Sequence, residues 1–419
     1  KIFMDYTHWR VDARLVSEFI NKSADTIAWL EEMGVEFYDV IAYIKGSHFT
    51  QHVVKPPVGG PGPRCASTMM KILTDRAIEL GAQIFLNTPV KKIIKEDGRI
   101  TGIIAEDSSG ETIQANAKAV IIATGGFGDN PEWIKKYTGY EWGRNIFSVR
   151  VPGLVGEGIQ MAWDVGAGRE EMSMELTCSI PFSLDPEKGK VGPDISYAPF
   201  RHPNLMVNIL GERFINEEVM GNPTFLGNAV SRQKGGCAFV ILNEEIVKHY
   251  EQNGFDWLNI MNPVEKVENL TSIIEQACQE NEHMFMADSL EELSDKTGIN
   301  LAALKKTVDE YNKVCETGRD EIFYKNPKYL RPIKQPKYFA GRFYPTAYGS
   351  LGGIKINYKT EVLTEDHEVI PGLYAAGVDA NAIYVDSYVF ILPGNTMAFA
   401  LNSGRIAGEN AAEYIKSVK

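Results

Sequence analysis

A short apolar segment, Ala119 to Ala123, runs directly into a glycine-rich segment, Thr124-Gly125-Gly126-Phe127-Gly128. A strand that is apolar on both faces has to be covered on both faces, as in a sheet with helices packed against it. Glycine lets backbone approach a ligand closely because it carries no Cβ. The pattern therefore predicts a buried strand that leads into a ligand-binding turn, although a glycine-rich turn alone is a weak signal.

Helix and strand patterns alternate around this segment. Apolar residues at helical spacing predict helices at 12–33 and 67–80. A strand is expected at 82–87, and a hairpin at 90–105 around Asp97-Gly98, which is a strong turn signal. The pattern is that of an α/β fold.

The middle of the chain differs in character. From about Glu170 to Tyr344 the sequence is more polar and irregular, and the α/β pattern then returns and ends in a long helix from about Asn395 to Val418. We therefore expect a discontinuous domain of residues 1–169 and 346–419, into which an α+β domain of residues 170–345 is inserted. A ligand crevice is expected between the two.

Composition excludes several functions. The net charge of −12 argues against a nucleic-acid partner and an anionic membrane surface. No apolar run approaches the roughly 20 residues of a membrane-spanning helix. The cysteines show no metal-binding or haem-attachment spacing. They are Cys65, Cys178, Cys237, Cys278 and Cys315. We expect no metal site and no membrane span, and a cytoplasmic location is favoured while the compartment stays open.

Two further motifs follow near the C-terminus. Ile370 to Gly377 is a short apolar strand that ends at a glycine and is followed by Asp379. Leu392 to Met397 opens the final helix. Backbone amides at a helix start are unpaired donors at the positive end of the helix dipole. They suit a carbonyl-rich ring edge, such as the pyrimidine end of a flavin.

The motifs ATGGFG, GERFINE, IPGLYAAG and PGNTMAFALNSGRIAGENAA stand in this order along the chain. Together they resemble the FAD-dependent fumarate reductase/succinate dehydrogenase flavoproteins, whose relatives include urocanate reductases and 3-ketosteroid dehydrogenases. The resemblance covers nearly the whole chain and is specific for the family rather than for the substrate. It implies FAD as cofactor, a Rossmann-like FAD-binding domain with an inserted α+β capping domain, a small-molecule substrate and an electron donor of unknown identity.

The resemblance also implies a strand–G-x-G-x-x-G–helix motif near the N-terminus, where the glycines hold the FAD pyrophosphate. No such motif is found, and the nearest candidate, Gly59-Gly60-Pro61-Gly62, lies in a proline-rich segment. Since the chain starts at Lys1, we expect it to be truncated at the N-terminus and to hold FAD weakly. The alternative is a protein whose cofactor site is lost or is completed by another chain.

Several positions are implied to contact FAD. Val90 would lie near the adenine, and Glu157 near the junction of the ribityl chain and the isoalloxazine ring. Thr396 and Met397 would present backbone groups to the pyrimidine edge. The complete predicted set is Val90, Thr124, Gly125, Glu157, Gly377, Asp379, Thr396 and Met397.

The segment Gly211 to Glu217 matches the family's G-x-R-F-x-N-E, and the resemblance implies that Arg213 delivers a proton to substrate. Arginine is an unusual acid because its pKa is so high, but it can stabilise developing negative charge. Arg201 would feed protons to Arg213, although the carboxylate partner expected three residues earlier is replaced by Ala198. Alternatively, Arg213 is architectural, and Arg201 binds an anionic substrate or forms a surface pair.

Two donors that would clamp a dicarboxylate are replaced by Tyr348 and Ile391, so we expect fumarate to be a poor substrate. The predicted pocket is aromatic and suits an enone or an aryl acrylate. Tyr348 is a further candidate catalytic residue. The predicted lining is Tyr348, Tyr384, Tyr388, Phe390, Arg201 and Arg213.

The sequence thus predicts FAD-dependent reduction of an activated C=C bond, with hydride from flavin N5 and a proton from an arginine. The alternatives are dehydrogenation of a ketosteroid-like compound and a non-catalytic remnant of an FAD-binding fold.

Overall fold

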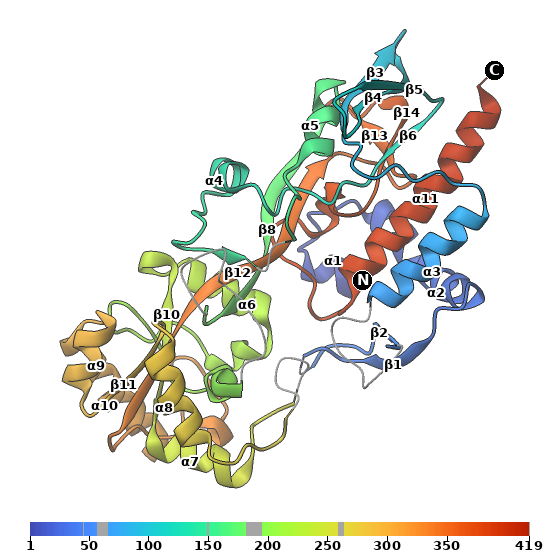
Figure 1. Cartoon of the computed structure of the whole chain (residues 1–419). Coiled ribbons are helices and arrows are strands. Elements are labelled where there is room, and N and C mark those ends of the chain that lie inside the picture. Colours follow the sequence, from blue (N-terminus) through green and yellow to red (C-terminus); the bar gives the residue numbers. More distant parts are fainter. Residues whose placement is uncertain (45, 57–65, 149–150, 182–194, 259–263, 419) are drawn as a thin grey trace.

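One long strand, β12 (Tyr338–Ile354), connects the two halves of the molecule (Figure 1). The structure is a computed structural model, which describes the chain except for residues 45, 57–65, 149–150, 182–194, 259–263 and 419. The first part of β12 pairs with β10 and β11, and the second part pairs with β7, β8 and β15. The strand therefore belongs to two hydrophobic cores.

The first core surrounds the start of β12. The sheet here has the order β11-β12-β10-β9, and every residue of β10 is buried, so both of its faces are covered. The strands are β9 (Met206–Asn208), β10 (Ala238–Asn243) and β11 (Met284–Ala287). The helices around them are α7 (Glu244–Asn253), α8 (Leu270–Glu280), α9 (Leu290–Thr297) and α10 (Leu301–Thr317).

The second core surrounds the end of β12. Its longest partner is β8 (Arg169–Ser179), which pairs antiparallel with β12 from Tyr344 to Ile354. The shorter partners are β7 (Phe147–Ser148) and β15 (Ala380–Asn381). The helices near this ladder are α4 (Pro131–Thr138), α5 (Glu157–Asp164) and α6 (Pro223–Ser231).

A parallel pair carries the glycine-rich turn. β6 (Val120–Ile122) runs parallel to β14 (Val369–Ala375), which pairs with β13 (Glu361–Leu363). The long helix α11 (Asn395–Ser417) packs on this sheet beside α2 (Ala13–Glu32). The remaining elements are α1 (Ile2–Tyr6), β1 (Phe37–Ile41), β2 (Gln51–Val54), α3 (Ala66–Glu79), β3 (Val90–Glu96), β4 (Arg99–Glu106) and β5 (Thr112–Asn116).

Most of the expected elements are present. Asp12 caps α2 by accepting hydrogen bonds from the amides of Arg14 and Leu15, as the preference for Asp at this position predicts. The predicted hairpin is formed by β3 and β4, and Asp97 and Gly98 both have positive φ (48° and 79°). Those angles fit the tight turn that matches the strand twist.

Two expectations were wrong. Residues 82–87 form no strand, and Ile84, Phe85 and Leu86 are exposed. The strand before the glycine turn was expected to be fully buried, but β6 is an edge strand and Ile121 is 42% exposed. A strand needs a neighbour to pair its amide groups. Among the described residues, segment 82–87 has no neighbouring strand, and β6 has a neighbour, β14, on one side only.

Other sequence expectations can be compared with the described residues. Cys65 and most of the proline-rich segment 55–64 lie outside them, and the four remaining cysteines are free. Within the described part of the chain, no helix is both long and apolar enough to cross a bilayer, and no cluster of His, Cys, Asp or Glu is suited to a metal ion.

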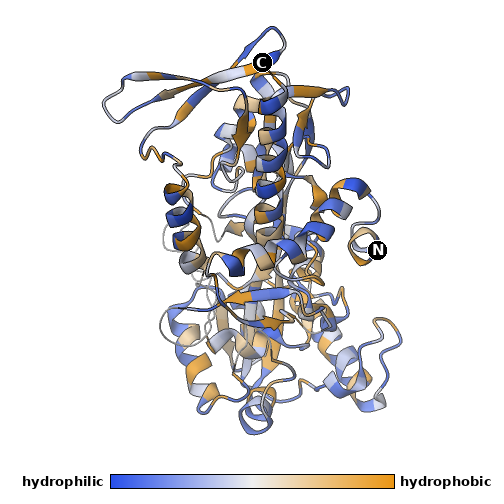
Figure 2. Cartoon of the chain, turned by 90° about the vertical axis from the view of Figure 1, so that its right-hand side faces the viewer, coloured by the Kyte–Doolittle hydropathy of each residue, from blue (hydrophilic) through white to orange (hydrophobic). Residues whose placement is uncertain are grey.

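Helix α11 buries residues at a spacing of three and four, such as Phe399, Asn402, Ser403 and Ile406, which is the pattern of an amphipathic helix. Figure 2 shows hydrophilic residues along its outward side. Gly404 lies on that side, and a Cβ added there would meet nothing within 4 Å.

Gly404→Ala is therefore expected to raise the free energy of unfolding by about 0.5–1 kcal/mol, because alanine restricts the unfolded chain and favours the helix. Gly227→Ala in α6 should lower it by about 1–3 kcal/mol, because the new Cβ would lie 2.6 Å from the Thr177 carbonyl oxygen of β8. Denaturant unfolding of both variants measures the difference. Equal stabilities would show that α6 does not pack on β8 as described.

Candidate active site

A cavity of about 60 Å³ lies beside the β8–β12 ladder and borders both hydrophobic cores. Its wall combines aromatic and aliphatic side chains with a few polar groups, as in a small-molecule site. The lining residues are Tyr43, Ile44, Thr177, Cys178, Ser179, Arg201, Met220, Gly221, Pro223, Leu226, Phe343, Thr346, Tyr348 and Phe390.

Two tyrosines meet in this cavity. Tyr43, which follows β1, shares a side-chain hydrogen bond with Tyr348 in β12. Tyr348 is 40% exposed, yet desolvation of its hydroxyl raises its pKa, and the hydrogen bond with Tyr43 partly offsets this rise.

Arg201 supplies the positive charge of the cavity wall. It ends the 3-10 helix η1 (Ile195–Arg201) and donates to the Ser179 Oγ at 3.3 Å. Its charge lowers the pKa of both Tyr43 and Tyr348, although burial outweighs this and leaves both pKa values raised. The charge of Arg201 therefore favours loss of a proton from Tyr348.

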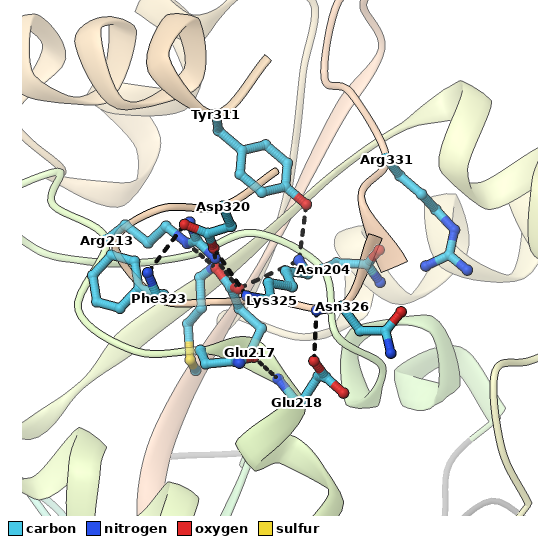
Figure 3. A network of polar contacts seen from close by, with 12 residues as sticks. Asn204, Arg213, Glu217, Glu218, Tyr311, Asp320, Phe323, Lys325, Asn326 and Arg331 are labelled. Atoms are coloured by element: carbon cyan, nitrogen blue, oxygen red, sulfur yellow. Dashed lines mark hydrogen bonds and ion pairs between the residues drawn. The ribbon is translucent and has the colours of Figure 1, made fainter. Parts of the chain in front are cut away.

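Arg213 does not line the cavity. Its Nε lies 2.7 Å from Glu217 Oε1, and its Nη2 lies 2.7 Å from Asp320 Oδ2 (Figure 3). The guanidinium also stacks on the ring of Phe323 at 4.6 Å. Burial lowers the pKa of Arg213, but the bond to Glu217 outweighs it and the pKa is raised overall. This arginine is held as a cation between two carboxylates.

The group around Arg213 is a buried cluster of two cations and two carboxylates. Lys325 lies 3.3 Å from Glu217 and donates to the Tyr311 hydroxyl at 2.8 Å. Burial lowers the pKa of Lys325, and Glu217 opposes this. Glu217 begins the 3-10 helix η2 (Glu217–Gly221), whose end lines the cavity. The cluster therefore positions one wall of the cavity.

The predicted FAD residues gather around the glycine-rich turn. The Asp379 carboxylate accepts hydrogen bonds from the Thr124 hydroxyl and from the amides of Thr124, Gly125 (3.0 Å) and Gly126 (2.9 Å). Burial raises the pKa of Asp379, and these bonds oppose the rise. Asp379 thus shapes the turn, and its carboxylate is already occupied by donors of this chain.

Two more predicted positions, Glu157 and Gly377, lie close to this turn, whereas Val90 does not. A Cβ on Gly158 would meet Thr124, so α5 begins against the turn and places Glu157 beside it, exposed. Gly377 donates from its amide to Ser403 Oγ at 2.9 Å and lies against Ala400 of α11. Val90 starts β3 in the separate β3-β4-β5 sheet, and none of the described contacts connects it to this group.

The start of α11 offers a test of whether a flavin suits this chain. Asn395 Oδ1 and Gln51 Oε1 are buried acceptors without a hydrogen-bond partner among the described residues, which is costly unless a ligand supplies a donor. Gly394 packs on Gln51, where a Cβ would lie 3.2 Å from its Cα. Met397 is 47% exposed and lines a second cavity of about 140 Å³. A flavin ring edge carries one N–H, which would satisfy one of these two acceptors.

The predicted catalytic residues lie in two separate places. Tyr348 and Arg201 come together in the cavity with Phe390, whereas Arg213 lies in the ion cluster. Tyr384 and Tyr388 were expected to line the pocket but are buried in the second core. Their rings pack against each other at 5.4 Å.

Sequence reasoning missed Tyr43 and Glu175. Tyr43 follows a half-buried strand and belongs to none of the motifs, so no signal identified it. Glu175 could have been noticed, because it is a single acidic residue between Met174 and Leu176 in a buried part of β8.

Comparison with known proteins gives consistent matches. A family model described as "FAD binding domain" matches residues 3–389. The chain is 31% identical over 418 residues to a vinyl phenol reductase of Lactiplantibacillus plantarum, covering 98% of this chain and 83% of that protein. It is 30% identical over 404 residues to an NADH:acrylate oxidoreductase of Vibrio harveyi, covering 96% of this chain and 37% of that protein.

The fold also matches a solved structure. The open conformation of a flavocytochrome c3 fumarate reductase superposes with a TM-score of 0.65 at 24% identity, covering 99% of this chain and 66% of that chain. At this level of identity the match concerns the fold alone.

Arg213→Ala is expected to lower the free energy of unfolding by about 3–5 kcal/mol, because it leaves buried carboxylates without their partner. Burial raises the pKa of Asp320, but the bond from Arg213 outweighs it, so the net pKa is lowered. This stabilisation is present above the unfolded pKa of an aspartate and is lost as pH falls through the lowered value. Urea unfolding at neutral and acidic pH measures both effects. Arg319→Ala is the control, because its pair with Glu321 is exposed; an equally small effect in both variants would contradict the structural role.

Proposed function

The chain belongs to the family of FAD-binding-domain flavoproteins, and on this basis we propose that it reduces the activated C=C bond of a substrate with a planar aromatic ring. The predicted family, fold class, FAD cofactor and enzyme class, an oxidoreductase acting on CH–CH groups, are confirmed. Its relatives include reductases named for vinyl phenol and acrylate. The identity of this chain's own substrate is the proposal.

The lining of the cavity carries the proposal. It combines the aromatic rings of Tyr43, Tyr348 and Phe390 with the single arginine, Arg201. Aromatic walls bind a flat ring through offset or edge contacts, and one cation pairs with one carboxylate or other anionic group. An aryl acrylate or a vinyl-substituted phenol has these features, whereas fumarate carries two carboxylates and no ring.

The same cavity disfavours the steroid alternative. Its volume of about 60 Å³ is small beside the roughly 150 Å³ cavity that holds a single benzene ring. The cavity wall would therefore have to move less to admit a single ring with a short side chain than to admit a fused four-ring steroid. The orphaned acceptors at the start of α11 support a flavoprotein over a non-catalytic remnant.

The proposed domain division follows the two cores. The first core consists of residues between 180 and 344 with Phe147, and the second draws on both ends of the chain. Met174 and Leu176 pack in the second core. We therefore propose that residues 1–179 and 346–419 form the FAD-binding domain, and that the capping domain begins about ten residues later than its expected start.

Reduction of a C=C bond needs a hydride and a proton. When bound, FAD supplies the hydride. Tyr348 would supply the proton through its hydroxyl, because Tyr43 and Arg201 both stabilise the phenolate that remains. Arg201 would also hold the anionic group of the substrate. Arg213 would fix the position of η2. This positioning role replaces the proton donation that the sequence motif implied.

Tyr348→Phe is expected to slow substrate reduction about 10²–10⁴-fold, the usual contribution of a general acid. Stopped-flow reoxidation of the reduced flavin by an aryl acrylate, normalised to flavin content, measures this step. Tyr344→Phe is the matched control, because Tyr344 lies in the same strand but packs in the first core. A normal rate in Tyr348→Phe would exclude Tyr348 as the proton donor.

An aryl acrylate or vinyl phenol is expected to be reduced much faster than fumarate, because Arg201 can neutralise only one of two carboxylates. Steady-state reduction with a viologen dye as electron donor compares the substrates without a natural donor. Comparable turnover of fumarate, or turnover of a ketosteroid alone, would reject the proposed substrate class.

A further inference from the structure

Glu175 is a buried carboxyl group in the wall behind the cavity. It lies in β8 between two core residues, Met174 and Leu176, and is 7% exposed. It forms no hydrogen bond or ion pair with any described residue. Burial raises the pKa of Glu175 to about 8, which favours the neutral acid at neutral pH. An unpaired buried carboxyl is costly for stability and is more frequent at functional sites than elsewhere.

The pairing of β8 with β12 places Glu175 next to Tyr348. Leu176 pairs with Ala347 and Met174 pairs with Ser350, so the single residue Glu175 faces both Tyr348 and Gly349 across a β-bulge. On the same face, Thr177 and Thr346 share a hydrogen bond of 2.5 Å at the cavity wall. A Cβ on Gly349 would lie 4.0 Å from Glu175 Oε2.

Among the described residues, three tyrosines are influenced by the charge of Glu175. Besides Tyr348, they are Tyr384 of the 3-10 helix η6 (Ala382–Tyr384) and Tyr388, and the charge of Glu175 would raise the pKa of all three. Beyond Tyr348 lie Tyr43 and the cation Arg201.

The helices packed on β8 supply no cation for this carboxyl. Helix α6 contains no ionisable residue. On α4, Lys135 pairs with Glu141 at 3.1 Å and Lys136 lies over the ring of Tyr137. Glu132 is exposed. A negative charge on Glu175 would therefore act mainly on the pKa values of the tyrosines.

We propose that Glu175 is a positioning residue that controls proton transfer by Tyr348, permitting it as a neutral acid and suppressing it as a carboxylate. The inference rests on the proposed role of Tyr348. In the reaction the Tyr348 O–H bond breaks, its proton joins the substrate carbon, and a phenolate remains. A carboxylate at Glu175 would place a second negative charge beside that phenolate and so oppose its formation. Glu175 does not line the cavity, so it acts through Tyr348.

The pH dependence of flavin reoxidation by substrate tests the proposal. In the natural chain the rate should fall above pH 8 by up to about tenfold per pH unit, because one group must stay protonated. Glu175→Gln keeps the shape of the side chain but cannot ionise, so this alkaline fall should disappear. Glu170→Gln, in the same strand but far from Tyr348, should keep the fall. An unchanged alkaline fall in Glu175→Gln overturns the proposal.

A titration without substrate separates this inference from the proposed function. The ultraviolet absorbance of the Tyr348 phenolate is obtained by subtracting the titration of the Tyr348→Phe variant. In Glu175→Gln the phenolate should form at lower pH than in the natural chain, whether or not any C=C substrate is reduced. If the two titrations coincide, Glu175 does not act on Tyr348, and the inference fails even when the reductase activity is confirmed.

Infrared difference spectroscopy provides a second measurement for the case in which Glu175→Gln is unstable. The spectrum of the natural chain, after subtraction of the spectrum of Glu175→Asp, should show a carboxylic-acid C=O band at neutral pH. This band should convert to a carboxylate band in alkali. A carboxylate band at neutral pH would overturn the proposal, because Glu175 would then be charged throughout the working range.

Discussion

The pairing of β12 with two different sets of strands is the constraint on which the rest of the structure depends. Its first residues, such as Phe339 and Phe343, pack in one core, and Ala347 and Leu351 pack in the other. A single strand cannot shift its register in one core without shifting it in the other. The cavity lies where the strand passes between them, so its shape is fixed by both cores.

The ion cluster around Arg213 illustrates how a motif can be read in two ways. The segment GERFINE matches a family motif that the resemblance associated with proton delivery, yet here Arg213 and Glu217 form the centre of a buried network. Removing one member of such a network leaves an uncompensated charge, so the motif residues depend on one another for the stability of the fold. The motif leads into η2, whose end lines the cavity, so the motif lies close to the cavity whatever the role of its arginine.

Sequence reasoning was reliable where local rules decide the outcome. Caps, turn glycines and helical periodicity located α2, the β3–β4 hairpin and α11 closely. It failed at 82–87, where a strand depends on a neighbouring strand, and at Tyr384 and Tyr388, where nearness in sequence to Phe390 did not mean a place on the cavity wall. Tyr43 could not be found because more than 300 residues separate it from Tyr348.

The bulge in β12 connects the fold to the chemistry. A regular ladder would place one β12 residue opposite Glu175, but here two residues, Tyr348 and Gly349, lie opposite it. Tyr348 lines the cavity, whereas Glu175 does not. Bulges often redirect a side chain near a site. In this chain the bulge brings an acidic group close to a tyrosine without a hydrogen bond between them, so their interaction is electrostatic and depends on the protonation of the carboxyl.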